Sequence, residues 1–182
     1  MSCDNDSFPT IRDCTITGNE AVNGGGIYSR TGGSPTVVQC TITQNSASLG
    51  GGLFRMEGES AVRNTIFWGN IAVTGHEIVL YSLFGLADTR LSVEHSNIRG
   101  GIADISHDGY CTLSWRDGNI DAEPKLTGDG FHLGPQSPCI DAGSDWGVYM
   151  DIDGDARPYG TGFDMGADEA ASGGGCFIGS LM

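Results

Sequence analysis

Basic residues are scarce in this chain, and their scarcity argues against two classes of partner. The sequence has one lysine and eight arginines against 23 acidic residues, which gives a formal net charge of −14. Such a surface repels phosphate backbones and anionic lipid headgroups. We therefore expect neither nucleic acid nor a membrane surface as a partner, whereas cations, above all calcium, suit this charge.

Several other sequence signals are also missing. No apolar run approaches the roughly 18 residues that a membrane span needs, and the start, MSCDNDSF, has neither the basic nor the apolar region of a signal peptide. None of the six cysteines forms a C-x-x-C pair, which argues against a structural zinc site. No window keeps a helical period, so we expect almost no helix.

An internal repeat dominates what is present. Residues 7–33 and 34–59 share the segment CTIT, an asparagine shortly after it and a run of three glycines, all at the offset that separates Cys14 from Cys40. A fixed period in this range indicates stacked units that cannot bury their apolar faces alone. The segment NTIFWGN begins a third unit after a slightly shorter offset, which places Phe67 on Ile42 and Asn70 on Asn45.

Two weaker units extend the stack to about five rungs. RLSVEHSNIRGG predicts the fourth, with Asn97 near its turn, and residues 116–139 predict the fifth. Cys14 and Ile16 share one face of a strand by their period of two, and each strand is expected to pair in register with its equivalent about 4.8 Å away. The sequence therefore predicts an all-β, right-handed parallel β-helix in which Cys14 and Cys40 stack. We expect both to be buried free thiols, with a disulfide as the alternative.

The chain divides into one domain and a tail. Residues 1–170 form the predicted β-helix, with an acidic C-terminal cap from about residue 140, and residues 171–182 form a Gly-rich flexible tail with a Cys-Phe-Ile motif. The first repeat begins almost at once, at Ser7, which leaves its strands open. We expect that upstream residues have been removed and that this open rung can self-associate.

The repeats resemble a known family. CTITGN and GGGIY look like rungs of right-handed parallel β-helix proteins of the pectate-lyase-like superfamily, and FHLGPQSPCIDAG with DIDGDARPYGTGFDMGADE resembles the closing motifs of choice-of-anchor Q domain proteins. GGGCFIGS is similar to their Gly-rich sorting tails. The resemblance covers about residues 7–170. It implies a secreted or cell-surface location in bacteria, and it implies no established reaction.

The closing motif supplies the candidate metal ligands. Asp151, Asp153 and Asp155 alternate along DIDGDARP, a spacing that offers several oxygens to a hard cation such as calcium. The other interpretation is that these acids cap turns and pair with Arg157. The four histidines show neither an i, i+4 pair nor an H-E-x-x-H motif, which argues against a histidine-based metal site.

The sequence favours a binding protein over an enzyme. A glycosidase needs two carboxylates across a cleft, and the abundance of acids makes any such pair weak evidence. A polysaccharide lyase needs cationic groups, which are rare here. Aromatic side chains that could stack on sugars are Trp68, Trp115, Trp146, Tyr28 and Tyr81, although core packing is the alternative for each. We therefore expect a non-enzymatic surface or secreted scaffold for adhesion or polysaccharide contact, with a carbohydrate-active enzyme fragment (hydrolase before lyase) as the alternative.

Overall fold

The chain folds into a parallel β-solenoid of about four turns, as seen in a computed structural model that describes residues 1–4, 7–30, 33–83 and 88–170. Every strand-to-strand pairing among these residues is parallel, and the only helical element there is one 3₁₀ turn, η1 (Gly101–Asp104). The predicted parallel β-helix architecture, with almost no helix, is confirmed. The C-terminal tail, residues 171–182, lies outside the described residues.

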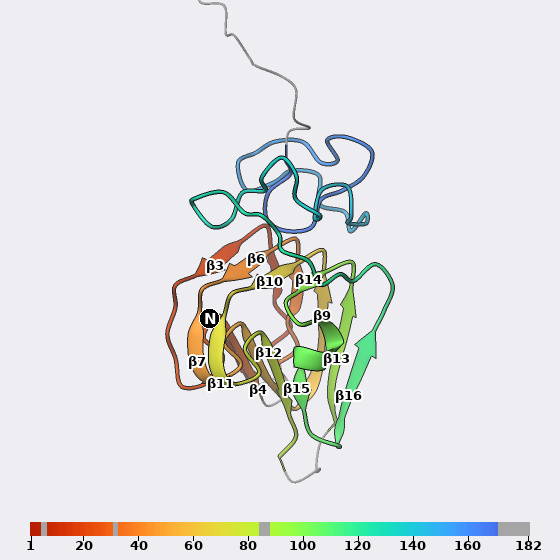
Figure 1. Ribbon diagram of the computed structural model, residues 1–182. Coiled ribbons are helices and arrows are strands. Elements are labelled where there is room, and N and C mark those ends of the chain that lie inside the picture. The colour runs from red at the N-terminus through yellow and green to blue at the C-terminus, as the bar shows by residue number, and fades with distance from the viewer. Residues whose placement is uncertain (5–6, 31–32, 84–87, 171–182) are drawn as a thin grey trace, which may run out of the picture.

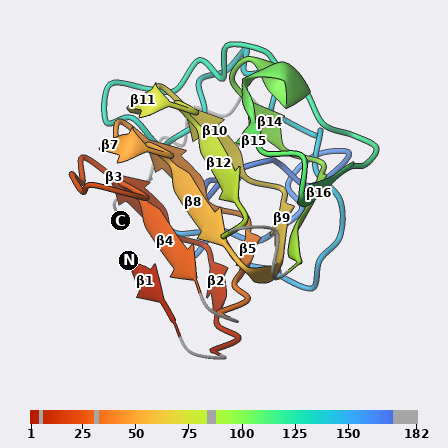
Figure 2. The same cartoon turned by 90° about the horizontal axis from the view of Figure 1, so that it is seen from below.

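Three sheets and one strand pair form the walls (Figures 1 and 2). Sheet 1 contains β1 (Ser2–Cys3), β4 (Ile27–Arg30), β8 (Leu53–Met56), β12 (Ile78–Tyr81) and β15 (Ser106–His107). Sheet 2 contains β3 (Thr15–Thr17), β6 (Thr41–Thr43), β10 (Ile66–Trp68) and β14 (Asn97–Ile98). Sheet 3 contains β2 (Thr10–Arg12), β5 (Thr36–Val38), β9 (Gly58–Arg63), β13 (Thr89–Glu94) and β16 (Cys111–Trp115). The separate pair is β7 (Ser46–Leu49) with β11 (Ile71–Thr74).

The repeat offsets set the register of the ladders. Ile16 pairs with Ile42 and Ile42 with Phe67, so both predicted offsets are confirmed. Because equivalent residues face the same way in each turn, like side chains form columns through the interior. Ile42 and Phe67 are fully buried, as is the column from Ile27 through Leu53 to Ile78.

The glycine runs serve two purposes. Gly24, Gly50 and Gly75 all adopt positive φ, between +58° and +64°, where a residue with a side chain would be strained. The glycines that follow lie where neighbouring turns nearly touch. A Cβ on Gly51 would lie 2.5 Å from the His76 carbonyl oxygen, and one on Gly52 would lie 2.6 Å from the Phe67 ring. The glycine run is thus required both for the turn and for close stacking of neighbouring turns.

Asparagines at equivalent positions form a ladder along the stack. The Asn19 side-chain amide donates to Asn45 Oδ1 at 2.9 Å, and that of Asn45 donates to Asn70 Oδ1 at 2.9 Å. Asn70 in turn donates to Glu77 Oε2. Asn45 and Asn70 also donate to the carbonyls of Ile16 and Ile42, so these buried amides are satisfied.

The fourth and fifth units differ from the prediction. Asn97 does not continue the asparagine ladder: it lies in β14, pairs with Ile66 and donates instead to the Ala122 carbonyl at 2.7 Å. Of the predicted fifth rung, 116–139, only Ile120 joins the ladder, through a single bridge to Asn97. The prediction of five rungs is therefore wrong by about one turn, because the fifth unit lacks the apolar strand needed to extend sheet 2.

The C-terminal segment, residues 121–170, lies against the outer face of sheet 2 (Figure 1). It contributes Leu133, Cys139 and Met165 to a second apolar cluster around Ile66, separate from the solenoid core. The Ala167 N–H donates to Thr41 Oγ1 at 3.0 Å, and the Gly166 N–H donates to the Asn64 carbonyl at 2.7 Å. The strands β6, β10 and β14 of sheet 2 are thus largely buried, whereas β3 at the end of the sheet is not.

Cys14 and Cys40 occupy equivalent positions next to Ile11, as the repeat predicts. Both are free thiols, Cys40 is fully buried, and Thr65 continues the column by accepting the Cys40 N–H with its hydroxyl. Cys14 is only half-buried, because it lies in the first turn of the stack.

Enlarging the side chain at the centre of this column should destabilise the fold. We expect Cys40→Phe to cost about 1–3 kcal/mol, because the extra atoms have no room in a packed interior. Urea denaturation followed by circular dichroism measures the effect, with Cys14→Phe in the half-buried position as the milder comparison. An unchanged unfolding midpoint for Cys40→Phe would contradict the burial of this column.

Candidate functional site: a groove along sheet 3

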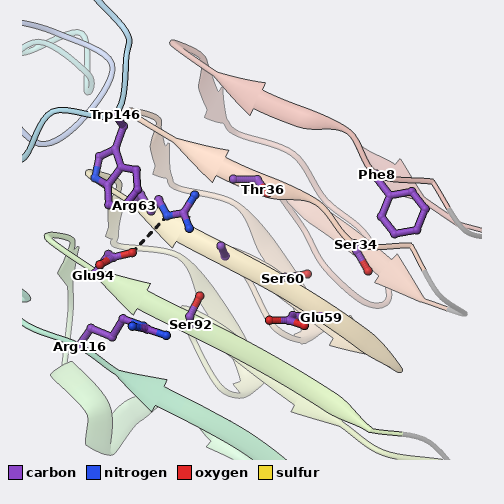
Figure 3. Close-up of a pocket in the computed structure, with 11 residues that line it drawn as sticks. Phe8, Ser34, Thr36, Glu59, Ser60, Arg63, Ser92, Glu94, Arg116 and Trp146 are labelled. Atoms are coloured by element: carbon purple, nitrogen blue, oxygen red, sulfur yellow. Dashed lines mark hydrogen bonds and ion pairs between the residues drawn. The ribbon is translucent and has the colours of Figure 1, made fainter.

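An open groove of about 620 Å³ runs over the outer face of sheet 3 (Figure 3). The alternating pattern of β9 turns Ser60 and Val62 inward and leaves Glu59, Ala61 and Arg63 facing out. Its lining combines carboxylates, guanidinium groups, hydroxyls and two aromatic rings: Phe8, Ser34, Thr36, Glu59, Ser60, Ala61, Arg63, Ser92, Glu94, Arg116 and Trp146.

Arg63 is held by two contacts in this groove. It lies directly opposite Glu94 in the pairing of β9 with β13, and its Nε donates to Glu94 Oε1 at 3.2 Å. Its guanidinium group lies 4.1 Å from the centre of the Trp146 ring, a cation–π contact. Figure 3 shows the three side chains together at one end of the groove. Both contacts hold Arg63 in place and leave its side chain 30% exposed.

Trp146 reaches the groove from the C-terminal segment, not from the sheet. The neighbouring Ser144 is fixed to the solenoid by two hydrogen bonds with the side chain of Asn64, at 2.6 and 3.0 Å. This clamp places the indole over β9. The sequence offered no sign of this contact, because Trp146 and Arg63 are far apart along the chain and share no motif.

The carboxylates of the groove are poorly placed for glycoside hydrolysis. Glu59 pairs in register with Arg90, four residues before Glu94 on β13. At about 3.3 Å per residue this register separates the two glutamates by roughly 13 Å along the strands. Paired catalytic carboxyl groups lie about 5–10 Å apart, and Glu94 is already held by Arg63. The arrangement fits hydrogen bonding to a polar ligand better than bond cleavage.

The three aspartates of the closing motif have different surroundings. Asp151 is buried, and its carboxylate accepts the N–H groups of Asp153, Asp155 and Glu169 at 2.8–3.0 Å. Asp153 and Asp155 are exposed. Asp151 therefore caps the turn that carries the other two, and binding of calcium by the three stays a prediction.

Arg157 has a different partner from the one that the sequence suggested. Its Nη1 donates to Glu169 Oε2 at 3.0 Å and its Nη2 donates to the Gly166 carbonyl at 3.0 Å. Both side chains of this ion pair are fully buried. The expected pairing of Arg157 with the nearby aspartates is wrong, because Asp151 is occupied by backbone N–H groups while Glu169 faces the guanidinium.

The aromatic residues do not gather on one face. Tyr28 and Tyr81 lie on either side of Phe54 along the outer face of sheet 1, with ring centres 5.6 and 6.3 Å from that of Phe54. Trp68 packs in the cluster under the C-terminal segment, and Trp115 packs against the solenoid core. Of the three tryptophans, Trp146 is the one that lines the groove on sheet 3.

Comparisons with protein-family models, curated proteins and solved structures find no match to this chain. Among the residues that the structure describes, no helix has the length and apolar character to cross a membrane.

Proposed function

We propose that this chain is a non-enzymatic binding module of a surface or secreted protein, and that the groove on sheet 3 contacts polysaccharide. The observation that carries the proposal is the composition of the groove: fixed carboxylate, guanidinium and hydroxyl groups beside an indole, on a rigid parallel sheet. Sugars present hydroxyl groups and apolar ring faces, and small numbers of well-placed polar groups beside aromatic rings recognise such ligands.

The surface location and the finer family membership belong to the same proposal. They rest on the resemblance of FHLGPQSPCIDAG and DIDGDARPYGTGFDMGADE to choice-of-anchor Q domain proteins of the pectate-lyase-like superfamily. The parallel β-solenoid is consistent with that resemblance. A carbohydrate-active enzyme is the alternative, and the register that separates Glu59 from Glu94 counts against it.

Binding to a panel of neutral and acidic oligosaccharides tests the proposal. Arg116→Ala and Glu59→Gln change groove residues, and Arg99→Ala removes an exposed arginine outside the groove lining as a control. We expect the groove variants to weaken calorimetric binding about tenfold, equivalent to about 1.4 kcal/mol, and the control to leave it unchanged. Binding that survives both groove variants would contradict this site, and release of new reducing ends would favour the enzyme.

We also infer that the first turn can bind a second copy of the chain. β2 and β3 end sheets 3 and 2, and the two-residue strand β1 ends sheet 1. A hollow of about 420 Å³ at this end is lined partly by Met1, Ile11, Cys14 and Ile16. Unpaired strand edges beside apolar side chains are a template for another chain.

Substituting the apolar residues of this end should prevent self-association. We expect the unaltered protein to gain apparent mass with concentration in light scattering. Ile16→Lys should remain monomeric, because docking a second strand would bury the unpaired lysine ammonium group. Ile11→Lys should act in the same way but should also lower stability, since Ile11 is only 5% exposed. A protein that is monomeric at all concentrations would contradict the inference.

A further inference from the structure

Three potential metal ligands converge within the C-terminal segment, away from the groove on sheet 3. Ligand atoms of His132, Asp153 and Asp168 all lie within 4.8 Å of one another. The three residues come from separate stretches of chain: the turn before Leu133, the tip of the turn that Asp151 caps, and the end of the described chain. Among the described residues, these three are the set of histidine and acidic side chains whose ligand atoms lie close enough together to hold one metal ion.

The imidazole of His132 is oriented by a residue outside this group. Asp129 Oδ2 lies 2.6 Å from His132 Nδ1, and Asp129 is itself fixed by Oδ1, which accepts the Phe131 N–H at 3.0 Å and the Thr127 hydroxyl at 2.9 Å. The other ring nitrogen, Nε2, is thereby directed at Asp153 Oδ2, 2.6 Å away. A carboxylate that holds one imidazole nitrogen while the other faces the ion is the usual outer shell of a metal-bound histidine.

The two aspartates differ in exposure, and together they suit an ion that must enter from solvent. Asp168 is 7% exposed, and its Oδ2 accepts the Leu133 N–H at 2.7 Å, so its position is fixed. A carboxylate can use its remaining lone pairs as a ligand while keeping such a bond. The Asp153 side chain is 49% exposed, so it can adjust to admit an ion between itself and Nε2.

The donor set selects the type of ion. Calcium takes six to eight oxygen ligands and magnesium keeps several waters, whereas imidazole nitrogen with carboxylate oxygen suits zinc and its neighbours in the first transition row. Zinc sites with three protein ligands leave a fourth position to water. We propose that His132, Asp153 and Asp168 bind a zinc ion, with Asp129 as the outer carboxylate that orients His132.

This site shares one residue with the predicted calcium loop and is otherwise distinct. Asp155 belongs only to the calcium loop, and His132 belongs only to the proposed zinc site. Asp153 and Asp155 are exposed aspartates two residues apart, which makes their asparagine variants a matched pair. Asp151 is unsuitable for a test, because its carboxylate holds three backbone N–H groups and its loss would disturb the fold.

Calorimetric titration of the chelator-treated protein with zinc, manganese or calcium chloride tests the proposal. We expect one zinc per chain, with His132→Gln and Asp153→Asn weakening zinc affinity at least tenfold and Asp155→Asn leaving it within twofold. Asp129→Asn should weaken it about 10–100-fold, as loss of an orienting carboxylate does elsewhere. Circular dichroism of each variant shows whether it is folded.

A second measurement on the unaltered protein removes the dependence on variants. Zinc should shift the imidazole ¹⁵N resonance of His132 Nε2 more than that of Nδ1 in long-range ¹H–¹⁵N spectra. Failure to bind zinc, or zinc binding that persists in both His132→Gln and Asp153→Asn, would overturn the proposal; the latter would indicate a thiol site. Calcium binding that depends on Asp155 and not on His132 would likewise overturn it in favour of the aspartate loop.

Discussion

Replacing Arg157 with methionine is expected to lower the free energy of unfolding by about 3–5 kcal/mol. Arg157 and Glu169 are both fully buried, so loss of the guanidinium leaves a carboxylate without its countercharge in a site that water does not reach. The Gly166 carbonyl also loses its donor from Arg157. Guanidinium chloride denaturation, followed by intrinsic fluorescence and by circular dichroism, measures the change.

A double substitution separates the ion pair from simple packing. Glu169→Gln keeps the size of the side chain and an oxygen that can accept the N–H groups of Tyr159 or Asp164. We expect the double variant Arg157→Met/Glu169→Gln to be less destabilised than the sum of the single variants, because no buried charge is left without a partner. Strictly additive losses would show that the two side chains act independently.

The stability of the protein should fall as the pH rises from about 4.5 to 7, and Glu77 should account for a large part of the fall. Burial raises the pKa of Glu77 from its ordinary value of 4.5 to about 7, although hydrogen bonding to Asn70 and the charge of Arg99 act in the opposite direction. The unfolded chain therefore loses this proton first, while the folded chain keeps it. The contribution of Glu77 to stability is full below pH 4.5, declines as the pH rises, and levels off above about 7.

Glu77→Gln isolates this contribution. A pKa shift of this size corresponds to about 3 kcal/mol. Between pH 4 and pH 8, the difference in unfolding free energy between Glu77→Gln and the unaltered protein should therefore shift by about this amount in favour of the variant. Asp164, whose pKa is also raised to about 7 by burial, contributes a slope of the same sign that remains in the variant. The measurement is therefore the difference between the two proteins across the pH range, with exposed Glu123→Gln as the control. Parallel curves for Glu77→Gln and the unaltered protein would contradict the assignment.

The repeat predicted the stacked turns well because each ladder position is local and periodic. Ile16, Ile42 and Phe67 fall in one column as expected, since in-register parallel pairing places equivalent residues together. The repeat aligned the asparagines that follow CTIT, but their hydrogen bonds to the next turn were not anticipated. The fourth turn was predicted less well because an insertion before Thr89 lengthens the distance in sequence between the third and fourth turns. Glu94 pairs with Arg63 across more residues than the repeat offset. The position of Asn97 alone therefore could not define the register of the fourth turn.

The sequence named Trp146 and Asp153 as candidate site residues, but it could not predict their partners because tertiary packing assembles both sites. Trp146 meets Arg63 only because the C-terminal segment folds back along sheet 2, which no periodicity encodes. His132, Asp153 and Asp168 belong to three separate turns of this segment, so a motif of closely spaced histidines cannot reveal them. Sequence patterns locate residues that repeat, whereas these groups occur once.

The asparagine ladder has a polarity that the backbone ladders lack. The links between its side chains all run in the same direction, from Asn19 to Asn45 to Asn70, and the series ends on the carboxyl group of Glu77. The Asn45 and Asn70 amides also donate back to the carbonyls of Ile16 and Ile42, so each of them ties its own turn to the turn before it. Loss of the Asn19 side chain leaves Asn45 Oδ1 with the Asn19 backbone N–H as a donor, whereas loss of Glu77 removes one acceptor of the Asn70 amide. An asparagine in the middle of the stack joins its turn to both neighbours, so replacing Asn45 would loosen the stack on both sides of it.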